Sequence, residues 1–180
     1  MSRRTLIWAT VALLVLIVEL GATIGTVAGD PFSPVAAWGL TRSPDALTFV
    51  TVVIGCAVLG LFGRFPRAVA AVATASYIVF ALRDHELGMF LPPMVVLFAL
   101  AALGRHRPTA LLCALTSLAA AAVWLAARTA PIAEPGVALL AWVAFGTVLA
   151  VFFLAPLLIG EIVRLRSMLR EGGGVRAEAQ

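Results

Sequence analysis

Six long apolar segments, separated by short polar breaks, run along the chain. They comprise residues 5–28, 45–63, 66–82, 87–103, 108–127 and 137–162. A helix that crosses the hydrocarbon core of a bilayer needs about 20 apolar residues, with a range of about 17–25. The breaks contain glycine, proline and charged residues, which are typical of turns. The pattern therefore predicts an all-α protein, a polytopic bundle of six transmembrane helices.

Composition indicates that lipid is the surrounding solvent. Hydrophobic residues make up 62% of the 180 positions and charged residues only 12%, and the mean hydropathy is +1.07. Soluble domains are nearer half apolar and about a quarter charged. A soluble domain of this length could not bury so much apolar surface. The segment at residues 5–28 is longer than the apolar part of a signal peptide, so we expect it to be retained.

Arginine placement predicts the orientation of the bundle. All thirteen basic residues are arginine. With the amino terminus in the cytoplasm, the inner segments hold Arg3, Arg4, Arg64, Arg67, Arg105, Arg107, Arg164, Arg166, Arg170 and Arg176, and the outer loops hold Arg42, Arg83 and Arg128. This asymmetry satisfies the positive-inside rule at every loop. We therefore expect a plasma-membrane protein with both termini in the cytoplasm, and we assign the net charge of +4 to topology rather than to nucleic-acid binding.

Glu19 is the acidic residue of greatest interest, because it lies past the middle of the first apolar segment. A carboxylate at the bilayer centre costs about 2.5–3.5 kcal/mol, so such a residue normally faces the bundle and has a partner. One interpretation is a group that responds to protons or to a ligand. The other is a structural group that is hydrogen-bonded within the bundle. The side chains that could serve as its partner are those of Thr23, Ser76, Tyr77, Thr116 and Ser117.

Small residues repeat every four positions on the same segment, at Gly21, Gly25 and Gly29. Such a stripe allows two helix backbones to approach closely. We expect it to pack on a neighbouring helix of the same chain, with dimerisation as the alternative.

Two prolines, Pro92 and Pro93, interrupt the fourth segment. The segment at 87–103 either kinks at the prolines or continues outward as a buried non-helical stretch at 88–91. Broken helices often line cavities. The two prolines, with Glu19 and Tyr77, form our candidate intramembrane site.

The last apolar segment continues past the membrane as an amphipathic helix through Arg164, Leu165 and Arg166. Pro156 should bend this helix, because proline has no backbone donor. The glycines at 172–174 should end it. The sequence thus predicts a transmembrane domain at 1–163, followed at 164–180 by a cytoplasmic exit helix and a flexible tail.

Motifs for a metal, a nucleotide or a catalytic triad are not found in the sequence. Asp84, His85 and Glu86 are adjacent and cannot all converge on one ion, so we expect a solvated outer loop there. The sequence therefore predicts no metal, no cofactor and no enzyme activity.

The layout resembles the N-terminal membrane region of actinobacterial two-component sensor histidine kinases. The resemblance rests on the order and spacing of five features: Glu19, the turn at 63–67, Pro92-Pro93, the turn at 105–108, and the exit helix through 164–166. It implies homodimers, a response-regulator pathway, and an exit helix that leads to a kinase core.

The chain departs from that family pattern at its carboxyl end. The family has a dimerisation helix with a phosphorylated histidine, followed by an ATP-binding domain. Here the sequence ends at Gln180, and neither His85 nor His106 lies in a phosphoacceptor context. We expect a separated or degenerate sensor region, or one that has lost its downstream part, without kinase activity.

Three functions remain open at the level of sequence. The first is a signal-input domain that responds to a stimulus in the bilayer and moves the last helix. The second is a small proton-coupled transporter or carrier built around Glu19 and the broken fourth segment. The third is an accessory subunit of a membrane complex. In each case the lipid bilayer is the immediate partner.

Overall fold

The computed structural model describes residues 3–28, 42–83, 85, 88–104 and 106–177, with side chains to residue 170. The described residues form helices and connections, with no strand among them. In chain order the elements are α1 (Arg3–Ala28), α2 (Ala46–Ala57), the 3-10 turn η1 (Val58–Leu61), α3 (Pro66–Leu82), α4 (Leu91–Leu103), α5 (Arg107–Thr129) and α6 (Pro135–Ala177). The predicted all-α class with six helices is confirmed.

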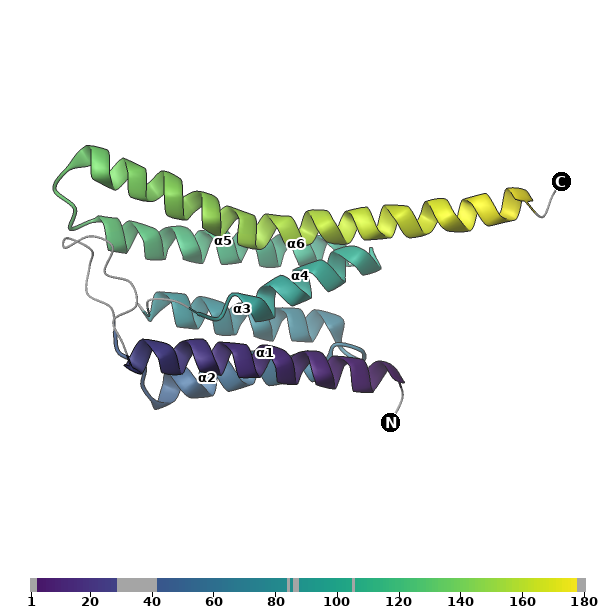
Figure 1. Cartoon of the computed structure of the whole chain (residues 1–180), viewed down its shortest axis with the longest axis horizontal. Helices are drawn as coiled ribbons and strands as arrows, with labels where there is room; N and C mark the ends of the chain where they lie inside the picture. Colours follow the sequence, from purple (N-terminus) through teal and green to yellow (C-terminus); the bar gives the residue numbers. More distant parts are fainter. Residues whose placement is uncertain (1–2, 29–41, 84, 86–87, 105, 178–180) are drawn as a thin grey trace.

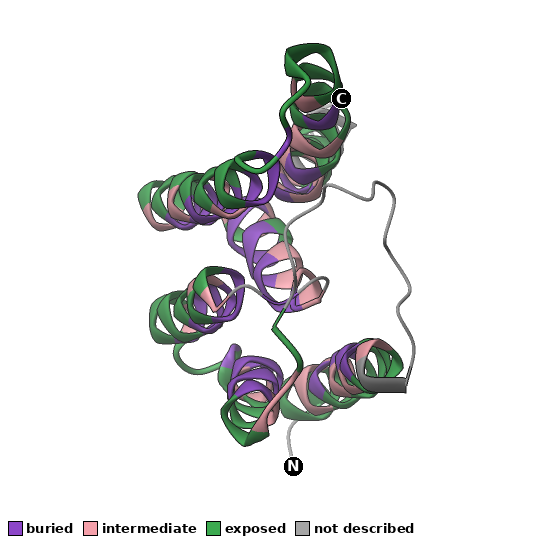
Figure 2. Ribbon diagram, turned by 90° about the vertical axis from the view of Figure 1, so that its left-hand side faces the viewer, coloured by how far each residue is buried: buried purple, intermediate pink, exposed green. Residues whose placement is uncertain are grey.

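Three of these helices, α1, α5 and α6, are long and apolar enough to cross a membrane. The elements α2 with η1, α3 and α4 are also apolar but shorter. The bundle carries its apolar residues on both its inner and its outer surface. Purple buried positions face the interior of the bundle in Figure 2, and green exposed positions face outward. Many exposed positions are leucine, isoleucine or valine, as a lipid environment requires.

Helix α4 occupies the middle of the bundle. It contacts α6, α3, α5 and α1, and Figure 1 shows it crossing between the pair α5–α6 and the group α1–α3. Its core-facing side chains, including Val96, Leu97 and Leu100, are fully buried. A shift of α4 would therefore alter its contacts with four other helices.

Local sequence signals explain where several helices begin. Asp45 caps α2 through a reciprocal capping box with Thr48, which satisfies donors that the first turn leaves free. Pro66 begins α3 at a position where no backbone donor is missed. Gly104 ends α4 in the left-handed conformation, with φ of 67°, which glycine adopts without steric cost.

Two predicted helix limits are wrong. Helix α4 begins at Leu91 rather than at residue 87, because Gly88 and Met89 have positive φ angles of 136° and 64° that a helix cannot accommodate. Helix α6 does not end at the glycines but runs through 172–174 to Ala177. Glycine lowers helix propensity, but it keeps its N–H, so the hydrogen-bond ladder continues.

Helix α6 is the longest element, with 43 residues. It changes direction in its middle and then projects well beyond the other helices, at the end of the bundle where the amino terminus also lies (Figure 1). Pro156 lies inside this helix, where it removes one bond of the ladder and favours a bend.

Candidate functional site

Glu19 binds the start of α4 with both of its carboxylate oxygens. The backbone N–H of Met89 donates to Oε2 at 2.6 Å, and that of Leu91 donates to Oε1 at 2.8 Å. The glutamate itself is only 3% exposed. One acidic side chain of α1 thus binds the first residue of α4, which lies 72 positions further along the chain.

The sequence around residue 90 explains why a carboxylate is needed there. Proline has no N–H, so Pro92 and Pro93 leave no donors to satisfy in the first turn of α4. Leu91 still carries one, and Met89 presents another just before the helix. Within a bilayer such donors have no water to bind. A negative charge also matches the positive end of the α4 dipole.

The connection before α4 adopts backbone conformations that are costly for most residues. Gly88 has a φ of 136°, and a Cβ atom there would lie 3.1 Å from Cζ of Phe80 and 3.8 Å from Oε2 of Glu19. Met89 has a φ of 64°, which costs a residue with a Cβ atom roughly 1–2 kcal/mol. Strain of this kind clusters at functional sites. The hydrogen bonds to Glu19 offset part of this strain.

The partners that the sequence suggested for Glu19 are wrong. Both described carboxylate bonds go to the backbone, and none goes to Ser76, Tyr77, Thr116 or Ser117. The Thr23 hydroxyl donates instead to the Glu19 backbone carbonyl at 2.8 Å. Of the two interpretations of the fourth segment, the simple kink is wrong and the non-helical stretch is confirmed for residues 88–90. Leu91 already belongs to α4, and of these three non-helical residues only Met89 is buried.

Tyr77 lies beside this site without a described bond to Glu19. Its ring contacts that of Phe90, the residue just before α4, with the ring centroids 5.6 Å apart. It also contacts the ring of Phe153 of α6, with the centroids 5.1 Å apart. Phe90 also contacts Phe152 of α6 at 5.2 Å. These aromatic rings join the start of α4 to the middle of α6.

The other end of α4 packs closely on α6. A Cβ atom at Gly160 would lie 2.6 Å from the carbonyl oxygen of Phe98 and 2.7 Å from Cβ of Ala101, so only glycine fits. At Gly104 an added Cβ would meet Cδ of Arg164 at 2.6 Å. The predicted exit residue Arg164 therefore lies against the end of α4.

A charged cluster joins the exit helix to α5. Arg107 donates to both oxygens of Glu161, at 2.9 and 2.7 Å, and Arg164 donates twice to Oε2 of the same carboxylate. Leu165 and Arg166 do not take part in this cluster. Sequence reasoning identified Arg164 but missed Glu161 and Arg107, although opposite charges three positions apart on a helix are a recognisable signal.

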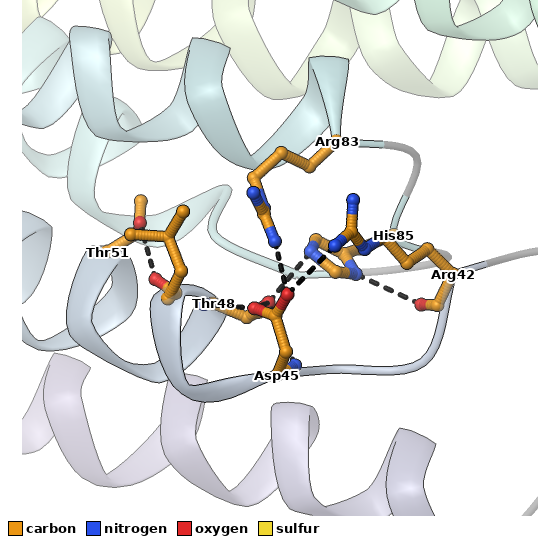
Figure 3. Close-up of polar contacts among 7 residues, drawn as sticks. Arg42, Asp45, Thr48, Thr51, Arg83 and His85 are labelled. Atoms are coloured by element: carbon orange, nitrogen blue, oxygen red, sulfur yellow. Dashed lines mark hydrogen bonds and ion pairs between the residues drawn. The ribbon is translucent and has the colours of Figure 1, made fainter.

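At the opposite end of the bundle a second polar cluster surrounds His85 (Figure 3). This ring is 3% exposed, with Nε2 at 2.8 Å from Oγ1 of Thr48 and Nδ1 at 3.0 Å from the carbonyl oxygen of Arg42. Asp45 pairs with both Arg42 and Arg83. The prediction of a solvated loop is wrong for His85. Asp84 and Glu86 lie outside the described residues.

Hydrogen bonding and burial shift the pKa values of Asp45 and His85 in this cluster. The Thr48 backbone and side chain, with Arg83 and Arg42, lower the pKa of Asp45 to about 2. Burial is the largest influence on His85 and lowers its pKa, while the Arg42 carbonyl acts in the opposite direction. The Nδ1 atom faces a carbonyl oxygen and donates to it. The Thr48 hydroxyl has a single proton, and it lies within hydrogen-bond distance of both Oδ1 of Asp45, at 2.9 Å, and Nε2 of His85, at 2.8 Å. Near neutral pH the cluster holds an ionised Asp45 and a neutral His85.

His85 also connects its loop to α5. The indole N–H of Trp124 donates to the His85 carbonyl at 3.1 Å. The link from α3 to α4 is thus held by α2 and α5 at His85 and by α1 at Met89. Within the described residues, no group of three or more His, Cys, Asp or Glu side chains could hold a metal ion.

The glycine stripe of α1 can be followed at Gly21 and Gly25, the two of its members that the structure describes. A Cβ atom at Gly21 or Gly25 would meet no atom of the described residues within 4 Å, and both glycines are exposed. Within the described ranges, no neighbouring helix of the same chain therefore packs on these two residues. Gly29 lies outside the described residues.

Comparison with known proteins yields no match. No family model, no curated protein and no solved structure matches the chain.

Proposed function

We propose that this protein is a membrane-embedded signal-input domain in which α4 couples Glu19 to the exit helix α6. In this proposal all six helices are inserted in the plasma membrane, with both termini in the cytoplasm. The arginine asymmetry and the three long apolar helices support this arrangement. A stimulus within the bilayer would change how α1 and α4 meet, and α6 would carry that change into the cytoplasm.

The observation that carries the proposal is the position of α4 between Glu19 of α1 and the exit helix α6. Its amino-terminal residue is bound by Glu19, and its carboxyl-terminal half touches α6 at Gly160 and Arg164. With 13 residues it is about 20 Å long, so it starts inside a hydrocarbon core of about 30 Å. A rigid element with a contact at each end can pass a displacement from one contact to the other, which supports signalling by a change of helix packing.

We further propose that the protein acts as a homodimer and feeds a kinase core or response-regulator pathway. The likeness in layout to sensor histidine kinases supports both points. No described residue would lie within 4 Å of a Cβ atom added at Gly21 or Gly25, which supports a contact with a second copy, since small-residue stripes are common at such contacts. No kinase activity is expected of this chain.

A fusion to a dimeric histidine-kinase core tests the proposal. The core is joined after Arg170, and its autophosphorylation is measured in membranes. Inserting one residue in α6 between Arg166 and Ser167 rotates the core by about 100°, so output should change with the insertion and recover near four inserted residues. Output that is indifferent to helical phase would contradict signalling through α6.

A proton-coupled transporter is the second candidate, because Glu19 is a buried acid in the bundle. Both of its oxygens are engaged by backbone donors, which favours a structural contact over a carrier site. Proton flux into proteoliposomes that disappears in Glu19→Gln and persists in Glu134→Gln would favour the transporter.

A further inference from the structure

The structure contains an apolar groove between α1, α4 and α6. Its volume is about 600 Å³, within the range of pockets that hold small molecules. The walls are apolar or aromatic except for Arg4, and include Trp8, Phe62 and Pro156. The rings of Trp8 and Phe62 pack together with centroids 4.3 Å apart.

We infer that this groove binds one acyl chain of an anionic phospholipid, whose phosphate is held by Arg4. The site goes beyond the proposed function, because lipid can bind there whether or not the protein signals.

The length of the groove matches one leaflet. Its α4 wall runs from Leu91 to Leu103, which is about 18 Å at the helical rise of about 1.5 Å per residue. One leaflet contributes about half of a hydrocarbon core of about 30 Å. Phe98, Leu103 and Ile159 line the groove and are partly exposed, so a lipid can enter from the side.

The positive charge at one end of the groove indicates that the bound lipid has an anionic headgroup. Arg4 is the charged residue of the groove wall, and it has no acidic partner among the residues that the structure describes. Trp8, one turn further into α1, has the amphipathic ring that prefers the headgroup level. Basic pockets at the cytoplasmic side of a helix bundle attract anionic headgroups, at about 1 kcal/mol for each arginine near the surface.

Native mass spectrometry of the full chain in detergent tests the inference. The probes are phosphatidylglycerol, phosphatidylcholine with the same acyl chains, and glycerol phosphate as a headgroup without a chain. We expect one tightly retained phosphatidylglycerol, bound about fivefold more strongly than phosphatidylcholine, as one arginine contact of about 1 kcal/mol implies. Glycerol phosphate alone should not be retained.

Two pairs of variants locate the lipid. Arg4→Gln should reduce phosphatidylglycerol binding about fivefold, to the level of phosphatidylcholine, whereas Arg3→Gln, which is outside the groove, should not. Ala102→Phe fills the groove and should abolish retention of both lipids. The same change at the exposed residue Ala119 of α5 should not. Circular dichroism and gel filtration confirm that each variant folds.

Several results would overturn the inference. Equal losses in Arg3→Gln and Arg4→Gln would show a general attraction to basic residues, and lipid retained by folded Ala102→Phe would place the site elsewhere. If Ala102→Phe instead converts a dimer to a monomer without changing lipid retention, the groove is a contact between copies. Weak, equal retention of all three probes would also contradict it.

Discussion

Glu19 shows how a single residue can be identified from sequence while its role is not. An acid in the middle of an apolar segment is visible in the sequence, but its partners are two backbone N–H groups. Every residue except proline carries such a donor, so residue types could not reveal which ones are left free. The information lay in Gly88 and the proline pair, which together determine where α4 begins.

Replacing Glu19 should weaken the fold in proportion to the bonds lost. Glu19→Gln keeps one carbonyl acceptor and loses the charge, so we expect a loss of about 1–3 kcal/mol in the free energy of unfolding, as for a hydrogen bond to a charged group. Glu19→Leu keeps no acceptor and should lose more. Denaturant unfolding in detergent measures both, with the exposed Glu134→Gln as the control. Equal stability of the wild type and Glu19→Leu would contradict the contact.

His85 should make stability depend on pH in the mildly acidic range. Its pKa is lowered from 6.5 by burial, so the unfolded chain takes up a proton at a higher pH than the folded chain. Its contribution to the free energy of unfolding is complete above about pH 6.5 and decreases as the pH falls below that value. Asp45, with a pKa of about 2, stays ionised throughout this range.

Thermal unfolding in detergent at about pH 7 and about pH 5 tests this expectation. The wild type should lose melting temperature on acidification, and His85→Gln, which cannot titrate, should lose less. The opposite order, with the variant more sensitive to acid, would show that His85 is not the group responsible. Sequence reasoning missed this cluster because residues 42–48 and 83–85 lie far apart along the chain.

At the scale of elements, hydropathy located the helices better than it located their ends. Apolar runs predict membrane helices because a helix that spans the hydrocarbon core needs apolar side chains along its length. They do not report where a backbone leaves the helical conformation, as it does at Met89. The extent of α6 was underestimated for a related reason, since glycine is an unfavourable helix residue rather than a forbidden one.

The contact between α4 and α6 should depend on Gly160. Gly160→Ala places a Cβ atom 2.6 Å from the Phe98 carbonyl oxygen, so the two helices must separate. On the same helix, Gly146→Ala meets only Cδ2 of Leu125 at 4.0 Å and should be neutral or slightly stabilising. Melting temperatures of the two variants in detergent compare the positions directly. Equal effects would mean that the close approach is not important for stability.

At the scale of the whole molecule, the predicted membrane topology depends on two features. Successive helices would cross the membrane in alternating directions, and arginine is more frequent in the inner segments than in the outer loops. The amino terminus and the end of α6 lie at the same end of the bundle (Figure 1), which agrees with an even number of crossings. Reporter fusions test the sidedness: fusions after Ala177 should report the cytoplasm, and fusions in the loop between α5 and α6, after Ala133, should report the outside. Both fusions on one side of the membrane would contradict the topology.

In the proposed mechanism, Glu19 determines, through α4, where the exit helix lies relative to α1. Spin labels at Leu6 of α1 and Leu169 of α6 can measure this relation, because both side chains are exposed, at 58% and 77%. The buried Cys56 and Cys113 are first replaced by alanine, and each doubly labelled chain is diluted with unlabelled protein so that distances within one chain dominate.

Pulsed electron–electron resonance on this labelled pair in lipid nanodiscs is the most direct test. We predict one narrow distance distribution for the parent chain and a shifted or broadened one for Glu19→Ala, with Glu134→Ala identical to the parent. A distribution that is unchanged in Glu19→Ala would contradict the coupling through α4.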